Sequence, residues 1–288
     1  MTKTTTWTTR GILNAKAGEA KFTLSRHSPT SSDIAFFVDR YWIIDWDLTD
    51  SEPYLQETLP YPCVHLVIEP DNTLIYGVDT GKFARLVQNR GRVFGIKFRP
   101  GAFYPFMQSS ISALTNRTLP PEQVFDVDGR TLEAAVLPLK EQVQMIARVE
   151  QFLQQHLPML DPNVTLINQI VDCIIDNRSV TRVEDIALQM ALSKRSLQRL
   201  FQQYVGVSPK WVIQRYRLQE AAEQLAADVT GGIATDQVTL AQQLGYFDQA
   251  HFIKDFKLIV GSTPAEYARK IAQSIAHSQI AQSLKPDN

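Results

Sequence analysis

Three polar residues in the C-terminal half have the types and spacing of a helix face that reads DNA bases. Arg195, Gln198 and Arg199 are three and four residues apart, which places them on one side of an α-helix. An Arg guanidinium can form two hydrogen bonds with guanine, and a Gln amide can do the same with adenine. The pattern therefore indicates contact with the major groove of double-stranded DNA, and the alternative is a basic face that meets only solvent.

A second candidate face follows about 55 residues later. Its predicted base-contacting residues are Gln249, Ala250, Ile253 and Lys254. Of these, Ala250 and Ile253 could touch only apolar groups such as the thymine methyl.

Local positive charge accompanies the first face. The stretch from Ser193 to Gln219 contains six Lys and Arg residues and no Asp or Glu, although the whole chain has a formal net charge of −1. A concentrated basic stretch is the electrostatic footprint that phosphate binding needs. We predict phosphate contacts at Lys194, Lys210, Arg215 and Lys257. Ordinary solubility charge is the competing interpretation.

The two faces belong to an internal repeat with an offset of 55 residues. The matched pairs are Ser193 and Asp248, Leu197 and Phe252, Arg199 and Lys254, Phe201 and Phe256, Gly206 and Gly261, Ser208 and Thr263, and Pro209 and Pro264. Ser or Asp can cap a helix start, Gly favours a left-handed helix end, and Ser-Pro or Thr-Pro begins the next helix. A self-match at one offset predicts a duplicated structural unit.

Each predicted unit also has a shorter helix in front. A capping box at Thr181–Glu184 opens the first, and Val238–Leu244 forms the second. Small residues stand where the two helices must cross: Ala187, Ala191, Ala241 and Gly245. Two helices joined by a tight turn make a helix-turn-helix, so the sequence predicts two of them.

One continuous helix is predicted between the units, from Pro209 to Ala226. At 1.5 Å per residue it would be roughly 27 Å long. With its flanking turns, it would separate the two base-reading helices by about 34 Å, one turn of DNA. A single chain could then enter two successive major grooves.

The first half of the chain has a different texture. We predict a helix over Ser32–Tyr41 and strands at Trp42–Trp46, Cys63–Ile68, Thr73–Tyr76 and Arg92–Arg99, followed by a short helix at Ala102–Met107. Strands separated by turns suggest an antiparallel sheet, barrel or sandwich. The predicted fold class is therefore α+β with two domains: an antiparallel β-rich N-terminal domain with a few helices, and an all-α C-terminal domain.

The expected boundaries follow from this change of texture. Residues 1–158 would form a sensor or dimerisation domain, residues 163–272 the double helix-turn-helix domain, and residues 273–288 a C-terminal tail. The amphipathic helix at 139–157 could form a dimer seam or pack on its own domain, and we slightly favour the seam.

Several classes of protein are disfavoured. Cys63 and Cys173 lie far apart, so no disulfide framework or metal pair is predicted, and both are expected to be inert buried thiols. The start of the chain lacks the apolar core of a signal peptide, and there is no run of 18 apolar residues. We expect a soluble cytoplasmic protein that is not an enzyme, has no cofactor and does not contact membranes. His65 is expected to be a hydrogen-bonded interior histidine.

The repeat resembles the AraC/XylS family of bacterial transcription regulators. The resemblance is carried by Leu192–Phe201 in the first unit, and by Gly245–Lys257 followed by Gly261–Tyr267 in the second. It covers about residues 165–270 and implies a sequence-specific DNA-binding regulator. Two departures from the family pattern stand in the second unit: Lys254 replaces a common Arg, and Ile253 replaces a small polar residue.

The N-terminal part resembles, more weakly, a β-rich sensor-type domain found in some of these regulators. The residues that carry this are Phe37–Trp42, Leu59–Leu66 and Phe94–Gly101. The resemblance implies a small-molecule effector or a homodimer, and regulation of transcription could involve RNA polymerase. Two alternatives remain at this point: an enzyme whose barrel carries the activity, and a protein-interaction adaptor that does not bind DNA.

Overall fold

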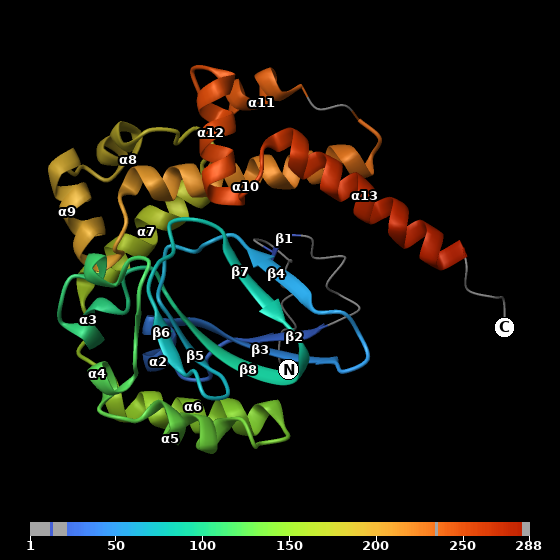
Figure 1. The fold of residues 1–288 in the computed structure, drawn as a ribbon. Coiled ribbons are helices and arrows are strands. Elements are labelled where there is room, and N and C mark those ends of the chain that lie inside the picture. Colours follow the sequence, from blue (N-terminus) through green and yellow to red (C-terminus); the bar gives the residue numbers. More distant parts are fainter. Residues whose placement is uncertain (1–11, 14–21, 234–235, 284–288) are drawn as a thin grey trace.

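The computed structural model describes residues 12–13, 22–233 and 236–283 (Figure 1). The first residues of the chain, on which the signal-peptide prediction rests, lie outside the described residues, as do residues 284–288 of the predicted tail. Within the described part, no helix is both long and apolar enough to cross a membrane.

A six-stranded antiparallel sheet forms the centre of the N-terminal region. Its strands, in spatial order, are β2 (Phe22–His27), β3 (Val38–Leu48), β8 (Asn89–Phe98), β5 (His65–Ile68), β6 (Leu74–Tyr76) and β9 (Thr118–Leu119). Helix α2 covers only Ser32–Phe37. The helix predicted to reach Tyr41 is therefore too long, because Val38 and Arg40 already pair with β8.

A second, three-stranded sheet was absent from the sequence prediction. It contains β1 (Ile12–Leu13), β4 (Tyr54–Thr58) and β7 (Phe83–Val87), all antiparallel. An ion pair between Arg85 on β7 and Glu69 after β5 joins the two sheets.

Two helices cover one face of the larger sheet (Figure 1). These are α5 (Gly129–Val136) and α6 (Gln142–His156). Buried Ile146, Val149 and Leu153 of α6 join Phe94 and Ile96 of the sheet in one core. The apolar face of α6 therefore packs on its own domain and is not free to form the favoured dimer seam; Val143, at the helix start, is left 75% exposed.

The opposite face of the sheet holds a buried polar cluster. Asp39 accepts from Lys97 Nζ at 3.0 Å and from Arg40 Nε at 2.8 Å. Burial alone would raise the pKa of Asp39, but these two cations lower it to about 2. Beside them, His65 Nε2 lies 3.5 Å from the buried Cys63 thiol, as expected for an interior histidine. Burial, reinforced by the Lys97 charge, lowers the pKa of His65 to about 3.

The neutral state of His65 predicts a specific acid sensitivity. Because the unfolded chain takes up this proton near pH 6.5, the contribution of His65 to stability is complete above pH 6.5 and is lost as the pH falls towards 3. The free energy of unfolding should fall by up to about 1.4 kcal/mol per pH unit in this range. Urea unfolding at several pH values should show a shallower fall in His65→Gln. Equal slopes for the variant and wild type between pH 6.5 and 4.5 would contradict the prediction.

Short helices connect the sheets to a helical C-terminal region. They are α3 (Tyr104–Met107), the 3-10 helix η1 (Ile111–Leu114) and α4 (Glu122–Phe125). The helical region contains α7 (Pro162–Asp176), α8 (Val183–Gln189), α9 (Lys194–Tyr204), α10 (Pro209–Thr230), α11 (Gln237–Gln243), α12 (Gln249–Val260) and α13 (Pro264–Ser283). The predicted α+β class with two parts is confirmed. Helix α13 continues past residue 272, where the tail was expected to begin.

Candidate nucleic-acid interface

Two helix pairs lie at opposite ends of the long helix α10 (Figure 1). We call α8–α9 unit 1 and α11–α12 unit 2. Each has its own hydrophobic core: Leu197 and Phe201 are fully buried in unit 1, and Phe252 and Phe256 in unit 2. The predicted pairing of helices and the predicted core residues are confirmed.

The predicted caps of the second helix in each unit are also present. Ser193 accepts a hydrogen bond from Ser196 N at 3.0 Å, and Asp248 accepts from His251 N at 2.8 Å. Both helices end at a glycine with positive φ, +92° at Gly206 and +86° at Gly261, where an L side chain would be strained.

The helices that follow begin as the repeat predicts. Ser208 accepts from Trp211 N, with Pro209 at the first helical position. Thr263 N donates to the Glu266 side chain at 2.8 Å, and Thr263 Oγ1 accepts from Glu266 N at 3.3 Å, which completes a capping box.

The cap of α8 differs from the prediction by one residue. Asp185, not Glu184, accepts hydrogen bonds from the backbone N–H groups of Thr181 and Arg182. Glu184 instead pairs with Lys194 Nζ at 2.6 Å on the surface. The box is displaced because α8 begins at Val183.

The turns inside the two units differ in length. Leu192 N bonds to Ala187 O in unit 1, and Tyr246 N bonds to Ala241 O in unit 2, an offset of 54 residues instead of 55. Unit 2 therefore has one extra residue before its second helix. That residue is Phe247, which is 98% exposed.

The predicted base-contacting face of α9 is open. Arg195, Gln198 and Arg199 are all exposed on the first half of the helix, opposite buried Leu197 and Phe201. On α12, Gln249, Ala250 and Lys254 are likewise exposed. Ile253 is half-buried because it packs against the core of unit 2.

Three of the four predicted phosphate-contacting residues are exposed: Lys194, Lys210 and Lys257. The fourth, Arg215, is fully buried, so the prediction that it contacts phosphate does not hold in this structure. Its Nε donates to Pro60 O at 2.6 Å, and it also donates to Gln219 Oε1. Its guanidinium carbon lies 4.5 Å from the ring centres of both Tyr61 and Tyr216.

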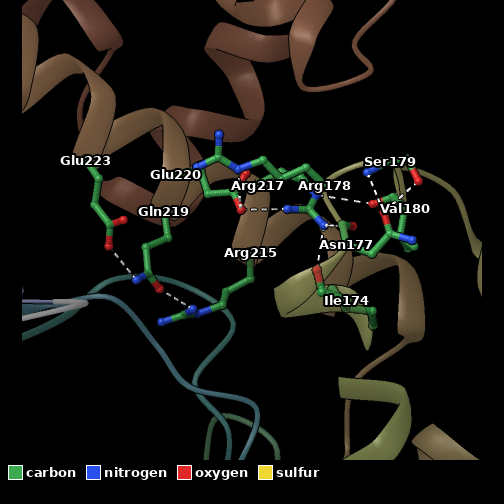
Figure 2. A network of polar contacts seen from close by, with 10 residues as sticks. All are labelled: Ile174, Asn177, Arg178, Ser179, Val180, Arg215, Arg217, Gln219, Glu220 and Glu223. Atoms are coloured by element: carbon green, nitrogen blue, oxygen red, sulfur yellow. Dashed lines mark hydrogen bonds and ion pairs between the residues drawn. The ribbon is translucent and has the colours of Figure 1, made fainter. Parts of the chain in front are cut away.

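Arg217, counted in the basic stretch, is also buried, at 2% exposure. Its Nη2 donates to Ile174 O at 2.5 Å and to Asn177 O at 2.8 Å, and its Nε donates to Val180 O at 3.2 Å. Figure 2 shows these bonds together with the ion pair between Arg217 and Glu220, whose N–O distance is 2.7 Å. Because helix C-termini carry unpaired carbonyls and partial negative charge, Arg217 attaches α10 to the end of α7.

The two units also touch each other and α10. A Cβ built on Gly245 in unit 2 would lie 2.7 Å from Thr181 Cβ in front of unit 1, so their backbones approach closely. Gln214 of α10 donates to Asp255 of α12 at 2.7 Å. The separation of the two faces thus depends on these contacts as well as on the length of α10.

The chain is similar to curated helix-turn-helix regulators over part of its length. It is 31% identical over 90 residues to an HTH-type transcriptional regulator of Haemophilus influenzae, covering 31% of this chain and 28% of the relative. It is 31% identical over 91 residues to the RCS-specific HTH-type transcriptional activator RclR of Escherichia coli, covering 32% and 30%. The matched part thus spans less than a third of these relatives.

Solved structures give weaker overall likeness. The C-terminal domain of AraT, a response regulator from Geobacillus stearothermophilus, is 26% identical with a TM-score of 0.33, covering 38% of this chain and 87% of AraT's. ToxT from Vibrio cholerae is 11% identical with a TM-score of 0.36, covering 88% of this chain and 99% of ToxT's.

Two family models match separate parts of the chain. Residues 26–120 match a domain of unknown function, DUF6597, and residues 186–270 match a helix-turn-helix domain. The second match contains α9, α10, α11 and α12 with the open faces described above. The chain therefore joins an N-terminal DUF6597 domain to a helix-turn-helix domain of the AraC type.

Proposed function

We propose that this protein is a sequence-specific DNA-binding transcription regulator whose two recognition helices, α9 and α12, enter adjacent major grooves. The observation that carries the proposal is the pair of exposed polar faces, each on the capped second helix of its unit. Helix α10 between them has 22 residues and is about 33 Å long, close to the roughly 34 Å of one DNA turn.

Roles within the interface follow from side-chain chemistry. Arg195, Gln198 and Arg199 would read bases from α9, and Gln249, Ala250 and Lys254 from α12, with a smaller contribution from half-buried Ile253. Lys194, Lys210 and Lys257 would bind phosphates. Unit 1 is the more basic of the two and should supply most of the affinity.

Salt dependence tests this proposal directly. Binding to DNA from the neighbourhood of the gene should weaken linearly on a log–log plot against salt concentration, because each neutralised phosphate releases counterions. In Lys210→Ala/Lys257→Ala, the slope should decrease by about 1.8, since each phosphate contact contributes about 0.9. The matched control is Lys140→Ala/Arg148→Ala, which removes the same charge from exposed residues outside the helix-turn-helix units.

Two outcomes would contradict the proposal. A slope near zero in the wild type would favour the protein-interaction adaptor. An equal decrease in both double variants would mean that net charge, and not the assigned surface, determines binding.

The N-terminal domain would modulate DNA binding through a small-molecule effector. Support comes from its direct contacts with α10, because a change in the domain would reach both units. A thermal-shift screen of metabolites on the full chain, followed by DNA titration with each hit, tests this. A hit that raises the Tm without changing DNA affinity would be a ligand but not an effector.

A further inference from the structure

Two loops of the N-terminal domain contact the helix-turn-helix region, one at each unit. The first, residues 59–61, joins β4 to β5, and the second, residues 77–82, joins β6 to β7. Each loop contributes a buried apolar residue to a core of the helical region. Leu59, 2% exposed, lies in the core of unit 2, and Val78, 1% exposed, lies in the core of unit 1.

Polar contacts fasten the same loops to α10. Trp211 Nε1 donates to Thr80 O at 3.2 Å, and Arg215 Nε donates to Pro60 O at 2.6 Å. Because Trp211 and Arg215 are four residues apart, they project from one face of α10. Figure 2 shows Arg215 extending from α10 toward the chain of the N-terminal domain.

The loops are themselves held in place. Asn116 Oδ1 accepts from Thr80 N at 2.8 Å, and Asn116 N donates to Val78 O at 3.0 Å, so both sides of the second loop are fixed. The Tyr61 ring of the first loop lies 4.1 Å from Lys97 Nζ of the sheet and 4.5 Å from the Arg215 guanidinium. A cation over an aromatic ring is attracted by the electron density of its face.

The second loop also reaches unit 2. A Cβ built on Gly261 would lie 2.6 Å from Lys82 Cε, and one built on Gly81 would lie 3.6 Å from Leu258 O. An ion pair with Glu57 on β4 restrains Lys82. One five-residue segment, 78–82, therefore touches unit 1, the start of α10 and the end of unit 2.

Unit 1 has a further set of contacts with the N-terminal domain. The rings of Tyr104 and Tyr204 lie 4.1 Å apart, and Gln203 Nε2 donates to Tyr104 Oη at 2.7 Å. Thr115 Oγ1 donates to Gly206 O at 2.7 Å. All of these contacts involve the C-terminal end of α9, which leaves its base-reading half open.

We propose that Trp211 and Arg215 are positioning residues of the DNA interface, through which the two loops of the N-terminal domain set the relative orientation of the two recognition helices. Neither residue touches DNA in this arrangement. They act by holding α10 against a rigid surface, so that both units are presented in one fixed geometry. The inference rests on the proposed function for its DNA arm and on geometry alone for its DNA-free arm.

The DNA-free experiment measures the distance between the recognition helices. Spin labels are attached at Gln198→Cys and Gln249→Cys, both exposed positions, in a Cys173→Ser background; Cys63 is buried. Double electron–electron resonance should give one narrow distance distribution in this reference protein. Trp211→Phe/Arg215→Met, which removes both polar attachments but keeps most of the side-chain volume, should broaden it.

A matched control variant makes the same chemical changes inside the N-terminal domain. Trp46 Nε1 donates to Gln88 O at 3.1 Å, and Arg92 Nη1 donates to Leu139 O at 2.9 Å. The distribution for Trp46→Phe/Arg92→Met should stay as narrow as the reference. If the double variant at the interface does not fold, as judged by circular dichroism, Trp211→Phe alone decides. An unchanged width in a folded interface variant overturns the proposal.

The DNA experiment adds a readout that a purely structural role would not change. Insertions of one to five base pairs between the two half-sites should weaken wild-type binding steeply, because the units are fixed relative to each other. In Trp211→Phe/Arg215→Met, binding at the best spacing should weaken about tenfold and depend less on spacing. Equally steep spacing dependence would overturn the proposal. Failure of the reference protein to bind any DNA would overturn the proposed function, while the distance measurement would still test the orientation.

Discussion

Replacement of Arg217 by methionine should lower the free energy of unfolding by about 3–5 kcal/mol, because it removes one member of a buried charged network. The guanidinium is 2% exposed and donates to three carbonyls and to Glu220. Methionine has a similar length but no donors. It would leave the carbonyls of Ile174, Asn177 and Val180 without this partner, together with the half-buried Glu220 carboxylate.

The measurement is urea unfolding followed by circular dichroism. Arg178→Met is the matched control, since Arg178 approaches the same Glu220 carboxylate at 3.9 Å but is 84% exposed. An exposed ion pair contributes at most about 1 kcal/mol, so the control should change stability little. Similar losses in the two variants would show that burial of Arg217 is not what matters.

Replacement of both Arg195 and Arg199 by alanine should remove most sequence-specific DNA binding. Each bidentate contact between an arginine and a guanine contributes about 1–3 kcal/mol of discrimination, so the pair would contribute about 2–6 kcal/mol. Affinity for the specific site should therefore fall by roughly 30-fold or more. Both side chains are exposed and neither has a structural contact in the described protein that alanine would break, so the fold should be retained.

A gel shift on specific and scrambled DNA measures this effect. Arg90→Ala/Arg148→Ala removes the same charge from exposed positions in the N-terminal domain and is the control. The control should keep its preference for the specific DNA. If the two double variants lose the same affinity, or if neither loses any, α9 is not the base-reading helix.

Features determined by neighbouring residues could be predicted from the sequence. The caps at Ser193 and Asp248 and the left-handed glycines Gly206 and Gly261 depend on bonds within a few residues. The same holds for the amphipathic face of α9. The Thr181 capping box was misplaced by one residue because Glu184 and Asp185 are adjacent carboxylates, and only the start of α8 decides between them.

Features determined by distant segments could not be predicted. Arg215 looks like a surface cation, but its partner Pro60 is 155 residues away, and the partners of Arg217 are carbonyls, which every residue has. One signal was available: Arg215 lies on the same stripe of α10 as Trp211, Leu218 and Ala222, which are apolar. The strands β4 and β7 were missed for a related reason. Their polar sequences do not alternate clearly, and they form a sheet only by pairing with each other and with β1.

The additional residue in the turn of unit 2 gives the two readers different shapes. Phe247 extends an aromatic ring beside the start of α12, whereas the shorter turn of unit 1 has no counterpart there. Identical tandem sequences would thus meet two unlike surfaces. Natural operators should be asymmetric, with the stretch facing α12 richer in thymine methyl groups and the stretch facing α9 richer in guanine, so that the protein binds in one direction relative to the promoter.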